Sequence, residues 1–81
     1  EKLSIKEQYN EYIFTSLRTI WGVSYSTITS RYGDEIASHF LNEIKEWEDS
    51  KHVISNTYNY TLTGIGKIFA DKIASELFIV D

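Results

Sequence analysis

The chain has 81 residues, of which 42% are hydrophobic, 15% aromatic and 25% charged, with no proline. This length suits one small domain, and the aromatic content excludes a disordered or low-complexity chain. The absence of cysteine excludes a disulfide framework, a thiolate-held iron–sulfur cluster and a cysteine nucleophile in these residues. The net charge of −4 opposes binding to phosphate backbones, so we expect no nucleic-acid partner.

The sequence begins with glutamate and contains no methionine, so we expect residues 1–81 to be a single domain cut from a longer protein. No run approaches the ~18 apolar residues that a membrane span needs. We therefore expect no membrane-spanning segment in these residues.

Residues 4–20 have the spacing of a first helix, because apolar side chains recur at steps of three and four. Ser4 followed by Glu7 is a capping-box pattern, and Gly22 marks the expected end. The apolar face of this helix comprises Ile5, Tyr9, Tyr12, Ile13, Leu17 and Ile20.

Two further helices are predicted next. Residues 24–32 follow Ser24 as an N-cap and stop at Gly33. Residues 34–50, with Asp34 as the expected cap, are strongly amphipathic. The apolar face of this third helix contains Ile36, Ala37, Phe40, Leu41, Ile44 and Trp47.

The helical period disappears after His52, where residues 53–62 predict two short strands around an Asn-containing turn, with Tyr58, Tyr60 and Leu62 on one face. Thr63 then caps a closing helix that continues to Phe78. Its expected apolar stripe is Ile65, Ile68, Phe69, Ile73 and Leu77. The fold class is therefore mostly α with a small β-hairpin (α+β), in the winged-helix layout of three helices, a two-stranded wing and a closing helix.

A winged helix most often binds DNA through the helix after the tight turn. Here residues 34–51 carry six acidic residues and two lysines, and the turn at 55–57 has no basic residue. Such a helix repels phosphates. A DNA-binding winged helix and a protein-interaction module of another kind both remain as alternatives.

The first helix carries the most unusual surface. On a helical wheel continued to residue 21, Asn10, Phe14 and Trp21 lie roughly 120° from the main apolar stripe. The two aromatics either pack under another helix or form a second interface, for which Trp and Arg are common anchors. The candidate docking residues are Asn10, Glu11, Phe14, Arg18 and Trp21.

His39 and His52 lack the spacing that places two ligands on one metal ion, so we expect each to be solvent-exposed or to cap a helix. We find no phosphate-binding loop and no nucleophile–base pair. We therefore expect no catalytic residue, bound metal or cofactor in this chain.

Five motifs together resemble a known family. They are Asn10-Glu11-Tyr12, Leu17-Arg18, Gly22-Val23, Gly33 and the Leu62-Thr63-x-x-Gly66 start of the last helix. This order, over essentially the whole chain, resembles the C-terminal domain of oxygen-independent coproporphyrinogen III oxidase-like radical SAM proteins. The sequence around Trp21 is most similar to the branch treated as haem chaperones.

The resemblance implies a preceding radical SAM barrel, whose Cys-x-x-x-Cys-x-x-Cys motif holds a 4Fe-4S cluster that cleaves S-adenosylmethionine. The parent is then either an oxidoreductase that converts propionates of coproporphyrinogen III to vinyl groups or a chaperone that binds and delivers haem. In both branches the C-terminal domain packs on the barrel and helps to close it. The family also implies a cytoplasmic location, since its cluster is oxygen-sensitive.

Overall fold

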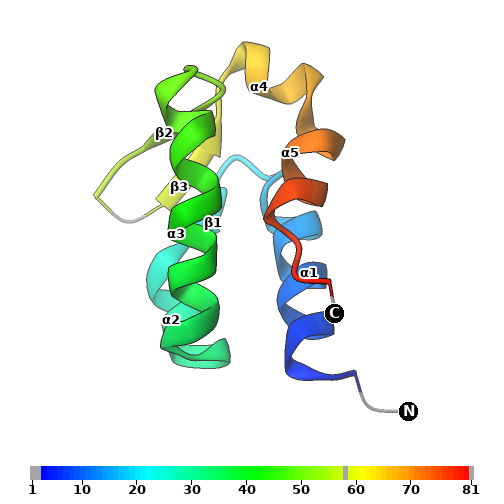
Figure 1. Ribbon diagram of the computed structural model, residues 1–81. Helices are drawn as coiled ribbons and strands as arrows, with labels where there is room; N and C mark the ends of the chain where they lie inside the picture. The colour runs from blue at the N-terminus through cyan, green and yellow to red at the C-terminus, as the bar shows by residue number, and fades with distance from the viewer. Residues whose placement is uncertain (1–2, 58, 81) are drawn as a thin grey trace.

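The computed structural model describes residues 3–57 and 59–80. Its elements, in chain order, are α1 (Ile5–Ser16), β1 (Val23–Ser24), α2 (Tyr25–Tyr32), α3 (Asp34–Asp49), β2 (Val53–Ser55), β3 (Asn59–Leu62), α4 (Gly64–Ile68) and α5 (Ala70–Leu77). In Figure 1, α2 and α3 stand on one side and α1 and α5 on the other, with α4 crossing the top. The predicted mostly helical α+β fold is confirmed.

The sheet has one more strand than the predicted two-stranded wing. It is antiparallel with the order β1-β3-β2, so β3 is central. β1 pairs Val23 with Tyr60, and β2 pairs Val53 with Leu62. A strand of two residues has no readable alternation, so the sequence did not indicate β1. Tyr58, predicted to share a face with Tyr60, lies outside the described residues.

The first helix ends earlier than predicted, at Ser16 instead of Ile20. Successive turns replace it: the Thr19 amide donates to the Ser16 carbonyl at 3.0 Å, and the Gly22 amide donates to the Thr19 hydroxyl at 3.0 Å. Gly22 has a φ of 71°, in the left-handed region that favours glycine. Trp21 therefore lies in a loop, and its helical-wheel position in the sequence analysis was wrong.

The predicted caps are mostly confirmed. Ser4 and Glu7 form the full capping box, and Ser24 caps α2. Asp34, however, is the first residue of α3, whose N-cap is Gly33 with a φ of 96° and no side-chain bond. A carboxylate in the first turn still favours the helix through its interaction with the helix dipole.

The predicted closing helix is broken at Phe69 into α4 and α5. The Phe69 amide donates to the Gly66 carbonyl, a three-residue step that tightens the chain. Because of this break, Ile65, Ile68 and Phe69 are exposed, although the helical period assigned them to the apolar stripe. Gly66 is buried, and a Cβ there would overlap the carbonyl oxygen of His52.

The core lies between the two helical sides and the sheet. Its fully buried larger side chains are Tyr9, Phe40, Ile13, Leu17, Ile28, Ile44, Ile73, Leu77, Val23 and Val53. Besides Ile65, Ile68 and Phe69, three more residues predicted to lie on apolar faces are exposed, namely Ile5, Ile20 and Leu41. Leu41 lies at the margin of its helical face, Ile5 is the first residue of α1, and Ile20 lies beyond the end of α1.

One carbonyl joins three helices. The Tyr9 hydroxyl on α1 donates to the Leu77 carbonyl on α5 at 2.8 Å, and the His39 Nε2 on α3 lies 3.1 Å from the same oxygen. His39 is half-buried and caps the end of α5, which confirms the capping alternative for this histidine. Burial raises the pKa of the Tyr9 hydroxyl, with a smaller contribution from Glu43.

Replacing Gly66 by alanine tests the close approach of α4 to the sheet. We expect Gly66→Ala to lower the free energy of unfolding by about 1–3 kcal/mol, because the added methyl group overlaps backbone. Gly64→Ala is the matched control, since nothing lies within 4 Å of a Cβ there and alanine favours a helix by about 0.5–1 kcal/mol. Urea unfolding measures both. Equal effects would contradict the packing described.

Replacing Tyr9 by phenylalanine tests the buried hydroxyl. At neutral pH, Tyr9→Phe should cost about 1 kcal/mol of stability for the lost hydrogen bond. Because folding raises the pKa of Tyr9, its contribution is present below a pH of about 10 and is lost at higher pH.

The wild type should therefore lose more stability between pH 9 and 11 than the Tyr9→Phe variant. Some loss remains in the variant, because burial and then Glu48 and Tyr25 also raise the pKa of Tyr60. Urea unfolding across this range gives the comparison, and identical pH slopes would contradict the role of Tyr9.

Candidate docking surface

Phe14 and Arg18 lie together at the end of α1. The Phe14 side chain is 47% exposed, and the Arg18 guanidinium carbon lies 4.5 Å from the centre of its ring. The same guanidinium forms an ion pair with Asp71 on α5. Arg18 therefore connects the two helices at the surface, with a cation–π contact and an exposed ion pair that each contribute at most about 1 kcal/mol.

Trp21 presents an exposed indole on an anchored backbone. Its side chain is 69% exposed, while its carbonyl accepts a hydrogen bond from the Asn59 side chain. The next residue, Gly22, lies so close to β3 that a Cβ would overlap the Tyr60 carbonyl oxygen. The loop position is thus fixed by backbone contacts, and the indole contributes little to the core.

The other two candidate residues lie in different surroundings. The Asn10 side chain forms two hydrogen bonds within the domain. Its Nδ2 donates to the Ile79 carbonyl at 2.9 Å, and its Oδ1 accepts from the Ile79 backbone amide at 2.8 Å. We therefore assign Asn10 to the fold. Glu11 is exposed and lines a shallow hollow with Tyr12 and Arg31, apart from the hollow that Arg18 lines.

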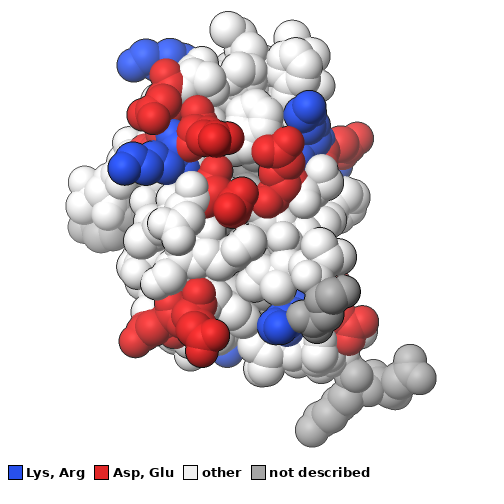
Figure 2. Space-filling view, viewed as in Figure 1, with Lys and Arg blue, Asp and Glu red and all other residues white. Residues whose placement is uncertain are grey.

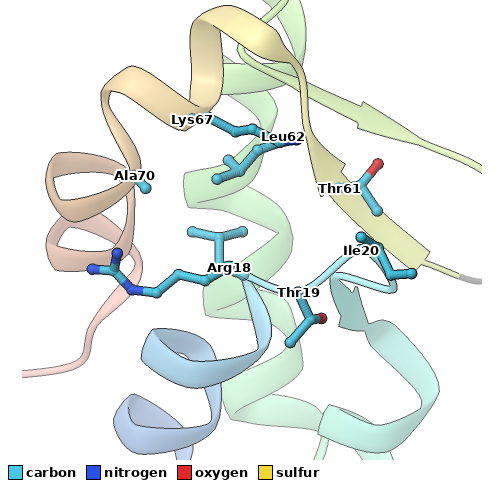
Figure 3. Close-up of a pocket in the computed structure, with 8 residues that line it drawn as sticks. Arg18, Thr19, Ile20, Thr61, Leu62, Lys67 and Ala70 are labelled. Carbon is cyan, nitrogen blue, oxygen red and sulfur yellow. The ribbon is translucent and has the colours of Figure 1, made fainter.

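A hollow of about 350 Å³ lies between the loop after α1, strand β3 and the junction of α4 and α5. It is lined by Leu17, Arg18, Thr19, Ile20, Thr61, Leu62, Lys67 and Ala70. Figure 3 shows Lys67 extending from α4 toward Leu62, while Arg18 extends toward α5. The lining thus contains two basic residues and no acidic one, in a chain that carries twelve acidic and eight basic residues.

Exposed apolar residues at and near this hollow were missed by sequence reasoning. Ile20 lines it and is 81% exposed, and Ile68, the neighbour of Lys67 in α4, is 79% exposed. The helical period assigned both to apolar faces. The signals available in the sequence were Gly22 and Gly66, since a glycine inside such a pattern can mark a close backbone approach.

Acidic side chains gather elsewhere. Figure 2 shows them over the side of the molecule on which α3 lies. The acidic residues of α3 are Asp34, Glu35, Glu43, Glu46, Glu48 and Asp49. The segment that would act as the recognition helix of a DNA-binding winged helix is therefore the most acidic in the chain.

His52 lies beside Ser50, whose hydroxyl oxygen is 2.7 Å from the His52 Nδ1. His52 is half-buried between the rings of Trp47 and Phe69, at 5.1 and 5.3 Å between ring centres. Within residues 3–57 and 59–80, no group of three or more His, Asp or Glu could hold a metal ion. Over the same residues, no helix has the length and apolar character to cross a membrane.

Comparison of the chain with protein-family models, curated proteins and solved structures gives no match. The family resemblance consequently depends on the motifs alone. In the structure, three motif glycines have backbone roles: Gly22 and Gly33 have positive φ, and Gly66 lies against His52.

The two tryptophans should differ in their exposure to solvent. In Trp47→Phe, the remaining Trp21 should emit at long wavelength and be strongly quenched by acrylamide, because its indole is mostly exposed. In Trp21→Phe, the remaining Trp47 should be quenched less, because its indole nitrogen is buried. Steady-state fluorescence measures both variants, and the reverse order of quenching would contradict the loop conformation.

Proposed function

We propose that this chain is a C-terminal accessory domain that docks on the radical SAM barrel of an oxygen-independent coproporphyrinogen III oxidase-like protein. The observation that carries the proposal is the exposure of Phe14 on α1 and of Ile20 and Trp21 in the loop after it, with Ile20 also lining the hollow. Aromatic and aliphatic side chains that add little to the core of so small a domain are typical of a binding surface.

The roles of the docking residues follow from their positions. Phe14 and Trp21 offer apolar area to a partner, and Trp21 can be covered without moving its anchored backbone. Arg18 offers the guanidinium donors that Asp71 leaves unused. Glu11 is exposed and can contribute a hydrogen-bond acceptor at the margin.

The chemistry of the proposed parent belongs to its barrel. This chain has no cysteine, so it does not fit a 4Fe-4S cluster and supplies no thiolate ligand to it. The barrel would bind the cluster and S-adenosylmethionine, and its substrate or cargo would be a tetrapyrrole, coproporphyrinogen III or haem. The same family assignment proposes a cytoplasmic location.

A DNA-binding winged helix is the second candidate. The arrangement of α2, Gly33 and α3 favours it, because two helices joined by a tight turn are the frame of a helix-turn-helix. The six acidic residues of α3 oppose it. A DNA-binding domain would show salt-dependent retention on duplex DNA, whereas the docking domain should not be retained.

The family assignment is tested by the coding sequence upstream of Glu1. A radical SAM parent has a Cys-x-x-x-Cys-x-x-Cys motif there. An upstream reading frame without these cysteines would overturn the family assignment.

Docking is tested by expressing the upstream domain separately and titrating this chain onto it. We expect Trp21→Ala to weaken docking by about tenfold or more, the loss of an anchor residue, while stability changes by no more than about 0.5 kcal/mol. Ile54→Ala is the matched control, since Ile54 is also an exposed apolar residue but lies on β2 outside the hollow. Calorimetry measures docking and urea unfolding measures stability. If Trp21→Ala lowered docking affinity and stability together, Trp21 would be acting as a core residue, and its docking role would be contradicted.

A further inference from the structure

The hollow between the loop after α1 and α4 has a charge opposite to that of the chain. Its cations are Lys67 and Arg18, and its lining contains no acidic side chain. Within the described part of the chain, Arg18 has a carboxylate partner, Asp71, and Lys67 has no ion-pair partner. The hollow therefore favours an anionic group, and the Lys67 ammonium is the cation available to it.

The rest of the lining is largely apolar. Leu17, Leu62 and Ala70 contribute alkyl groups, and Ile20 forms an exposed border. A volume of about 350 Å³ lies at the low end of ligand pockets, so it suits one or two side chains. A carboxylate next to an aliphatic side chain would pair with the cations of the lining and pack against its alkyl groups.

Asp71 occupies a place that an incoming carboxylate could take. It pairs with Arg18, yet its side chain is 86% exposed, so solvent weakens the pair and exchange costs little. Removing the Asp71 charge would make the Arg18 guanidinium available to a ligand. Substitutions of Lys67 and Asp71 should therefore have opposite effects on affinity. Loss of the Lys67 charge weakens binding of an anionic ligand, and loss of the Asp71 charge strengthens it.

We propose that this hollow receives an acidic side chain of the docking partner, from a segment in which Glu or Asp is flanked by aliphatic residues. The inference rests on the proposed function, because it names the partner chemistry of the same surface. The acidic α3 repels such a segment, so charge also directs it to the hollow.

The test is an NMR titration of the ¹⁵N-labelled chain with the peptide Ac-Gly-Leu-Glu-Leu-Gly-NH₂. We expect amide shifts at residues 17–20, 61–62 and 67–70, and much weaker shifts with the Gln-containing peptide. Lys67→Gln should lower affinity about three- to fivefold, the range of a partly exposed ion pair, and Asp71→Asn should raise it. Lys72→Gln, an exposed change of the same charge outside the hollow, should leave it unchanged.

Several outcomes would overturn the inference: equal binding of the Gln peptide, shifts located elsewhere, no shift at millimolar peptide, or the same shifts with acetate alone. Dispersed spectra of each variant show that it is folded, so a lost affinity is not a lost fold. The result is also separable from the proposed function. If the peptide binds but no cluster motif lies upstream, the inference of an acidic partner stands and the family assignment fails. If the motif is present but the peptide does not bind, the family assignment stands and the inference fails.

Discussion

The carbonyl oxygen of Leu77 is the point on which the arrangement of the helices depends. It accepts from Tyr9 on α1 and faces the ring nitrogen of His39 on α3, so the end of α5 is attached to both helical sides. Leu77 is fully buried, and a buried carbonyl without partners is costly. Asn10 continues the attachment two residues later, at Ile79. With α5 held along α1, Asp71 comes within reach of Arg18, and the surface proposed for docking acquires its geometry.

Two close backbone approaches frame the hollow from opposite ends. Gly22 fixes the loop after α1 against Tyr60 of β3, and Gly66 fixes α4 against His52 just before β2. Between these contacts lie the loop, the central strand and the short helix that line the hollow. Both glycines belong to the motifs that resemble the coproporphyrinogen oxidase-like family. The two glycines therefore fix the backbone around the hollow, and the proposed docking contacts would come from the exposed side chains.

Local patterns predicted the elements well, because caps and amphipathic periods are local properties. The capping box at Ser4 and the long apolar face of α3 are examples. The errors arose where contacts with backbone far away in the sequence determine the local conformation. Pairing with β3 makes a strand of residues 23–24, and contact with His52 turns α4 away from the core. Trp21 lies outside the core, as one of its two predicted alternatives required, but in a loop instead of on a helix. Lys67 gave no signal in the sequence, because a single lysine has no periodic signature.

The distribution of charge favours one orientation of a partner on the proposed docking surface. A small domain buries only about 60% of the surface of its unfolded chain, so apolar residues are needed in its core. Ile20, Trp21 and Ile68 lie outside that core, where they add to the risk of aggregation unless a partner covers them. Complementary charge selects the orientation of a complex more than its strength. Acidic residues concentrated on α3, together with the cations at the hollow, would turn an acidic partner segment away from the helix-turn-helix and toward Lys67.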